Sequence, residues 1–204
     1  MGRKHENALS DRWIGQIASD REEAEIIRYG LHQLFLIAVN AATIAGCALL
    51  WGQPFFCLLL FLIIFTLRPY AGGYHADTEL RCYVLSVGVM NLAMLCRCRM
   101  DIPIVVSLLL YIGAAGIIWQ YAPVANPQRP LDRIEVQRYA KKAKELVILL
   151  SIVAAAGIWL KASAAADAVF CGFFIIALSL LAGKWKYRAG SRRFKEAEEL
   201  EWDT

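Results

Sequence analysis

The chain alternates between long apolar runs and short polar stretches. Six runs contain no Asp or Glu, and they cover residues 31–51, 54–67, 83–95, 102–121, 146–160 and 168–183. A helix needs about 20 residues to cross roughly 30 Å of bilayer hydrocarbon, so the first and fourth runs are long enough to span it. The runs at 54–67 and 83–95 are short, and we expect their helices either to extend into the polar stretch between them or to thin the bilayer locally.

A different pattern precedes the first run. Between Asp11 and Leu31 the apolar residues recur at intervals of three, four and seven, with charged residues between them. This spacing predicts an amphipathic helix, which either packs on the cytosolic face of the protein or touches the membrane surface. Residues 1–30 lack the apolar core and cleavage site of a secretory signal peptide, so we expect nothing to be removed there.

Together the patterns predict an all-α, polytopic membrane helical protein with about six transmembrane segments and an N-terminal amphipathic helix. We expect a single domain over residues 1–204, because membrane helices bury most of their surface against one another. Its parts are a cytosolic helix at 1–30, a transmembrane region at 31–183 and a cytosolic tail at 184–204.

Composition and charge agree with a membrane protein and predict its orientation. The chain is 58% hydrophobic with a mean hydropathy of +0.45, which excludes an ordinary soluble domain. With six spans and a cytosolic N-terminus, 19 of the 22 Lys and Arg residues fall on the inner side. The positive-inside rule therefore predicts a multi-pass protein of the cell membrane, with both termini and the polar stretch 68–82 in the cytosol.

That polar stretch contains the residue types of a cysteine peptidase. Cys82 follows His75 by seven residues, about two helical turns, so in a helix the two side chains share a face but their backbones lie about 10 Å apart. We therefore expect His75 to lie on a loop or first turn and to fold back toward Cys82. A histidine near a thiol favours the reactive thiolate, and Arg68 and Arg81 either do the same or hold a substrate carboxylate.

The spacing alone leaves a simpler interpretation open. A cysteine at the start of an apolar run is commonly a small buried hydrophobe, and a loop histidine is commonly solvated.

The residue sequence of the polar stretch is more specific than the spacing of His75 and Cys82. Arg68, the run Gly72-Gly73-Tyr74-His75-Ala76 and Cys82, with hydrophobic segments on both sides, closely resemble the accessory gene regulator protein B (AgrB) family. These proteins are membrane peptidases that process quorum-sensing propeptides. The resemblance covers most of the chain, including a later Tyr121-Ala122-Pro123 that precedes a basic loop. It implies that His75 and Cys82 are the catalytic dyad and that Arg68 and Gly73 support it.

The resemblance also implies a reaction. A cysteine endopeptidase would cleave the C-terminal part of a small AgrD-like propeptide through a thioester on Cys82. A thiol or hydroxyl of the propeptide would then displace the enzyme and close a thiolactone or lactone ring. The alternative from another functional class is a non-catalytic small transporter or scaffold, in which the stretch 68–82 merely connects two helices.

The basic loop at 123–145 is the second candidate for function. It opens with three prolines, which disfavour a helix, and continues in a helical pattern that carries Arg138, Lys141, Lys142 and Lys144. These four residues either anchor the positive-inside topology or bind an acidic propeptide. The partners we expect are thus the propeptide and membrane lipids; a homodimer is left open, and nucleic acid is not expected.

The remaining cysteines give no sign of metal or cofactor chemistry. Five are left after Cys82, and none has a metal-ligand spacing, so we interpret them as packing residues and expect no metal and no cofactor. Cys96 and Cys98 are predicted on the outer side, where a disulfide or a partner thiol stays open, although such close cysteines rarely have good bridging geometry. The motifs of phosphate loops, zinc proteases and serine hydrolases are absent.

Overall fold

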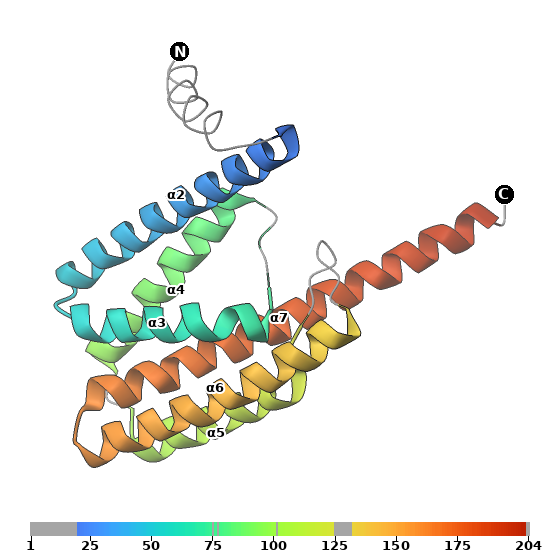
Figure 1. Ribbon diagram of the computed structural model, residues 1–204. Helices are drawn as coiled ribbons and strands as arrows, with labels where there is room; N and C mark the ends of the chain where they lie inside the picture. The colour runs from blue at the N-terminus through green and yellow to red at the C-terminus, as the bar shows by residue number, and fades with distance from the viewer. Residues whose placement is uncertain (1–19, 75, 77, 101, 125–131, 203–204) are drawn as a thin grey trace. The chain divides into compact units, whose positions relative to one another are not determined.

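The computed structural model describes residues 20–202 except 75, 77, 101 and 125–131, and it describes side chains as far as residue 187. The described residues fold into helices, with one isolated β-bridge and no strand. This confirms the all-α prediction (Figure 1). The helices are α2 (Arg21–Leu50), α3 (Pro54–Ala71), α4 (Glu79–Arg99), α5 (Ile104–Tyr121), α6 (Arg133–Trp159) and α7 (Ser163–Trp202).

Five of these helices are long and apolar enough to cross a membrane, namely α2, α3, α4, α5 and the part of α7 from Ser163 to Tyr187. The apolar run at 146–160 forms the end of α6, whose first half is charged, so α6 is not among the five. The protein is therefore a multi-pass membrane protein with five such helices in its described part.

The two short runs become longer helices, as one of the two alternatives predicts. Helix α3 continues past the apolar run through Arg68 to Ala71 and has 18 residues, and α4 has 21. Thr78 caps α4, since its hydroxyl accepts the N–H of Arg81 at 3.3 Å. The polar stretch is thereby reduced to a short connection between two helix ends.

Helix α2 differs from the predicted division at residue 30. Asp20 caps it by accepting the N–H of Glu23 at 2.8 Å, and the helix then runs without interruption to Leu50. The amphipathic pattern after residue 20 thus belongs to the same helix as the first apolar run, and the pattern before it lies outside the described residues. Two compact units, Met1–Ile44 and Ala45–Thr204, divide the chain within α2. A single domain over 1–204 stays a prediction.

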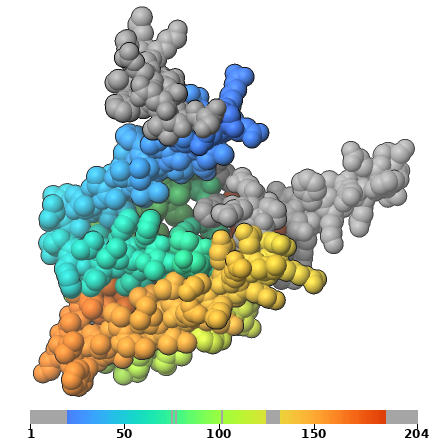
Figure 2. Space-filling model, in the orientation of Figure 1, coloured from blue at the N-terminus to red at the C-terminus, as the bar shows by residue number. Residues whose placement is uncertain are grey.

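The core of the second unit forms around α7, which packs against α3, α5 and α6 (Figure 1). Phe173, Ile176 and Leu180 of α7 are fully buried. Small residues bring the helices close: a Cβ at Gly172 would lie 2.7 Å from a methyl carbon of Ile63. Figure 2 shows the surfaces of α3 and α6 in contact on one face of this unit.

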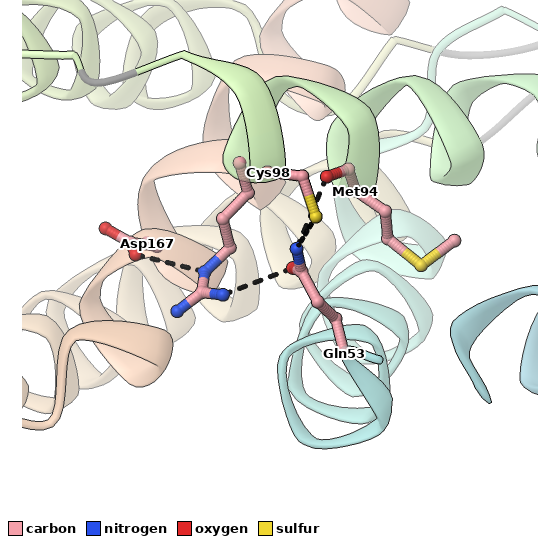
Figure 3. Close-up of polar contacts among 5 residues, drawn as sticks. Gln53, Met94, Cys98 and Asp167 are labelled. Atoms are coloured by element: carbon pink, nitrogen blue, oxygen red, sulfur yellow. Dashed lines mark hydrogen bonds and ion pairs between the residues drawn. The ribbon is translucent and has the colours of Figure 1, made fainter. Parts of the chain in front are cut away.

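Polar side chains fasten the end of α4 to the start of α3 and the start of α7 (Figure 3). Arg97 donates to Asp167 and to the Gln53 carbonyl oxygen, both at 3.2 Å, and Gln53 donates to the Cys98 sulfur. We call Arg97, Asp167, Gln53 and Cys98 the Arg97 cluster. The buried side chains of α4 are also in its second half, so this half anchors the helix.

Candidate functional site

Gly72, Gly73 and Tyr74, which we call the motif turn, follow the end of α3. Gly72 has φ +72° and Gly73 has φ +120°, in the region that favours glycine. A Cβ at Gly72 would lie 2.2 Å from the carbonyl oxygen of Val124, and the N–H of Val124 donates to the carbonyl of Ala71 at 3.0 Å. One side of the turn is therefore held by the segment that follows α5.

The other side of the motif turn rests on α7. The N–H of Tyr74 donates to the carbonyl oxygen of Ser179 at 2.9 Å, and the hydroxyl of Tyr187 donates to the carbonyl of Gly73 at 3.4 Å. A Cβ at Gly183 would lie 2.7 Å from the carbonyl carbon of Gly73. Since Ser179, Gly183 and Tyr187 are spaced by four, they form one stripe of α7 that receives the turn.

Arg68 joins the motif turn to α7. From the last turn of α3, its Nη1 donates to the Ser179 hydroxyl at 2.9 Å and its Nη2 donates to the carbonyl oxygen of Tyr74. Both acceptors are neutral, and among the described residues no carboxylate pairs with Arg68. The described contacts thus fix the guanidinium between the motif turn and α7.

Cys82 lies in the first turn of α4 with an exposed side chain. Its N–H donates to the carbonyl of Thr78 at 3.0 Å. The N-terminal end of a helix carries a partial positive charge, which favours an anion such as a thiolate nearby. The thiol is therefore accessible and lies at the N-terminal end of a helix.

Two of the four predicted catalytic and supporting residues, Arg68 and Gly73, are brought together by the contacts above. Cys82 is on the neighbouring helix end. His75 lies outside the described residues, so the His75–Cys82 dyad stays a prediction.

The four basic residues of α6 that the sequence singled out fall into two pairs. Arg138 and Lys141 are exposed. Lys142 donates to Glu145 at 3.0 Å, and this hydrogen bond, with the charge of Glu145, raises the pKa of Lys142. Lys144 lies over the ring of Trp119 at 5.2 Å. The sequence therefore predicted one group of four cationic side chains, and two of these have partners within the protein.

An aromatic contact links α6 to the region of the motif turn. The rings of Tyr139 and Tyr70 meet edge to face at 5.9 Å. Tyr70 is two residues from Gly72, so the basic first half of α6 is near the turn.

Sequence reasoning missed the contribution of α7. Lys184 lies over the Tyr121 ring at 3.6 Å, and Lys186 lies over the Tyr74 ring at 4.8 Å. Lys186 thus joins Ser179, Gly183 and Tyr187 in contact with the motif turn. The available signal was a Ser and a Gly four residues apart in an apolar run, which is typical of a close helix contact. Among the described residues, no group of three or more His, Cys, Asp and Glu side chains is placed to hold a metal ion.

Comparison with known proteins identifies a family whose model matches most of this chain. Residues 10–181 match the family model described as Accessory gene regulator B. The chain is 28% identical over 128 residues to "Accessory gene regulator protein B" of Staphylococcus intermedius, over 63% of this chain and 68% of the relative. It is 22% identical over 153 residues to a "Putative AgrB-like protein" of Clostridium perfringens, over 71% of this chain and 72% of the relative. No solved structure matches.

Proposed function

Because the chain belongs to the accessory gene regulator B family, which implies a part in quorum-sensing peptide processing, we propose that it is a membrane-embedded cysteine endopeptidase. Its substrate is a small AgrD-like autoinducer propeptide. The enzyme cleaves the C-terminal part of this propeptide and promotes cyclisation of the remainder to a thiolactone or lactone.

In the first step, His75 accepts the proton of the Cys82 thiol, and the thiolate attacks a peptide carbonyl of the propeptide. The C–N bond breaks, the leaving amine takes the proton from His75, and an acyl thioester remains on Cys82. In the second step, a thiol or hydroxyl of the propeptide attacks this thioester. The new ring bond forms, the bond to Cys82 breaks, and the proton of the attacking group returns to the enzyme.

One observation carries the proposal: the thiol of Cys82 is exposed in the first turn of α4, the helix that follows a motif turn held against α7 by Arg68. A thiolate is the reactive form of cysteine, and positive potential favours it. The glycines of the motif turn support Arg68, because they let its anchoring backbone approach α7 closely.

The conversion of an amide to a thioester is energetically uphill. We therefore propose that the reaction is drawn forward by exclusion of water and by removal of the C-terminal fragment or the cyclic product.

We further propose that the substrate is held by the basic face of α6, at Arg138, Lys141, Lys142 and Lys144. The exposed pair offers charge to an acidic segment, and the contact of Tyr139 with Tyr70 brings this helix close to the motif turn. In this arrangement the motif turn and both termini face the cytosol, where a newly made propeptide is available.

The second candidate function is a non-catalytic small membrane transporter or scaffold. Transporters commonly hold buried charges or broken helices at a midplane site. In the described part, no polar or charged side chain is fully buried, which disfavours this candidate.

The test compares two exposed cysteines of the same helix. Cys82→Ala and, separately, Cys98→Ala are co-expressed with a candidate propeptide, an amphipathic peptide with a central Cys or Ser, and cleavage is followed by gel mobility. We expect Cys82→Ala and His75→Ala to abolish cleavage while the protein accumulates in the membrane, and Cys98→Ala to retain it. Wild-type cleavage by Cys82→Ala would exclude Cys82 as the nucleophile and leave the transporter or scaffold as the better candidate.

A further inference from the structure

The apolar parts of α5, α6 and α7 reach their polar limit at the same end of the second unit. The apolar run of α5 ends at Tyr121, that of α7 ends just before Lys184, and that of α6 begins just after Glu145. Contacts bring these points together, because Lys184 lies over the Tyr121 ring and Lys144 lies over the Trp119 ring. The three limits therefore share one level, as expected where bilayer hydrocarbon gives way to lipid headgroups.

Exposed tryptophans lie at this level. Trp119 is 46% exposed, and Trp185, next to Lys184 at the end of the membrane-spanning part of α7, is 80% exposed. Tryptophan is enriched at the border between hydrocarbon and headgroups, because its ring is apolar while its N–H donates a hydrogen bond. This end of the three helices thus has the aromatic residues of a headgroup layer.

An apolar stripe of α5 leads to Trp119. Val105, Leu109, Ile112 and Trp119 are spaced by four, three and seven residues, so they share one face of the helix. The first three are 65%, 65% and 57% exposed, and a Cβ at Gly116 on the same face would meet nothing within 4 Å. The other helices of the second unit therefore leave this face of α5 open to lipid chains.

Two positive charges lie at the end of the stripe. The amino groups of Lys144 and Lys184 are placed over rings in the last turn of α5, at 5.2 and 3.6 Å, and a ring orients an ammonium group without neutralising it. The ion pairs found among the described residues include neither lysine. At the opposite end Arg97 also lies over a ring, but it pairs with Asp167. The two lysines thus leave their charge available to an anion from outside the protein.

We infer that Lys144 and Lys184 bind the headgroup phosphate of an anionic phospholipid whose acyl chain lies along the exposed stripe of α5. A phosphate at this depth meets two ammonium groups, and basic sites between membrane helices commonly bind such headgroups. The inference goes beyond the proposed function, since it does not involve Cys82 or the propeptide.

A second copy of the chain is a less suitable occupant of the stripe. In a two-fold dimer the same patch of both protomers meets itself, so Lys144 and Lys184 would face the same lysines of the partner. Like charges at one level repel, whereas an anionic lipid neutralises them.

The test measures lipid binding to the full-length protein by native mass spectrometry after release from a mild detergent. Phosphatidylglycerol and phosphatidylcholine with identical acyl chains are titrated separately, and the apparent Kd of the first bound lipid is determined. We expect the anionic lipid to bind about tenfold more tightly than the zwitterionic one, and millimolar inorganic phosphate not to displace it. The sample contains no propeptide, so the role proposed for Lys144 in substrate binding does not enter the measurement.

Three double variants assign the binding to these lysines. Lys144→Gln with Lys184→Gln should weaken phosphatidylglycerol binding about tenfold and leave phosphatidylcholine binding unchanged. Lys144→Arg with Lys184→Arg keeps both charges and should keep the affinity. Arg99→Gln with Lys161→Gln removes two exposed cations from the opposite end and is the matched control, for which we expect the wild-type affinity.

Unchanged phosphatidylglycerol affinity in the Lys144→Gln, Lys184→Gln variant overturns the inference. So does an equal loss in the control variant, equal affinity for the two lipids, or displacement by inorganic phosphate, which would indicate a site for a free anion. A dimer that excludes lipid would assign the stripe to a second copy. If the double Gln variant does not fold, Lys184→Gln alone decides, with an expected loss of about threefold.

Discussion

Two parts of the second unit each hold an arginine side chain by hydrogen bonds, and they give it different partners. In the Arg97 cluster, the guanidinium has a carboxylate partner in Asp167 and also lies 5.0 Å from the centre of the Phe56 ring. The neighbouring Cys98 accepts a hydrogen bond from Gln53. At the motif turn, the partners of Arg68 among the described residues are the neutral Ser179 hydroxyl and the Tyr74 carbonyl oxygen.

The difference separates an arginine that forms an ion pair from one that, in the proposed mechanism, supports the catalytic residues. A carboxylate partner cancels most of the field of Arg97 at a distance, and a half-exposed ion pair contributes only about 0–1 kcal/mol to stability. The cluster fastens the end of α4 and leaves little net charge.

The predicted topology gives the comparison its sharpest test. If the motif turn is cytosolic, an impermeant maleimide added to intact cells should label Cys98 and leave Cys82 unlabelled, with both labelled after permeabilisation. Variants that keep only one of the two cysteines make the readout unambiguous. Labelling of Cys82 from outside, with Cys98 protected, would reverse the orientation and remove the cytosolic substrate from the proposed mechanism.

Removing the charge of Arg68 should affect propeptide cleavage far more than removing the charge of Arg97. We expect Arg68→Gln to lower the rate of propeptide cleavage about a hundredfold, the loss typical of removing a preorganised electrostatic group. Arg97→Gln should change cleavage little and instead lower the melting temperature, because it leaves Asp167 without its partner. Equal losses of cleavage in the two variants, at equal membrane abundance, would contradict the distinction.

The close packing of the motif turn on α7 should be sensitive to a single methyl group. Gly183→Ala places a Cβ against the backbone of Gly73, so we expect cleavage to fall about tenfold, or about 1.4 kcal/mol in the barrier. Gly113→Ala on α5 is the matched control, since a Cβ there meets open space. Both changes favour the helix equally, so unaltered cleavage in Gly183→Ala would mean that the turn tolerates displacement.

The smallest effect is expected from the basic face of α6. Reversal of Lys141, Lys142 and Lys144 to Glu should reduce cleavage a few-fold at limiting propeptide and much less at saturating propeptide, because exposed charges are screened and act on binding. Arg99→Glu, at the far end of α4, serves as the control charge reversal. Unchanged cleavage at limiting propeptide, in a variant whose orientation is verified by maleimide labelling, would assign these lysines to topology alone.

The local sequence was sufficient to predict the helices. Their apolar runs are long and free of carboxylates, and in a bilayer a chain must satisfy its backbone hydrogen bonds within each helix. The helix ends were less certain from the pattern, since α3 and α4 extend into the polar stretch. The first half of α6 is charged, so its apolar run is too short to count as a membrane span.

Part of the site was equally visible in the sequence. The Gly-Gly pair, Arg68 and Cys82 are close together along the chain, so their spacing and residue types were enough to single them out, as was the resemblance to a family. The sequence by itself thus determined the membrane class of the protein, its helical elements and the candidate reactive residues.

Only the tertiary structure brought Ser179, Gly183 and Tyr187 to the motif turn. They lie more than 100 residues after it, in a run whose pattern indicates only packing. Whether a serine in such a run bonds to its own helix or to an arginine elsewhere depends on how closely two helices approach, and that distance is set by the glycines on both sides together. The same holds for Arg97, because only the packing of α4 against the start of α7 brings the Asp167 carboxylate to it.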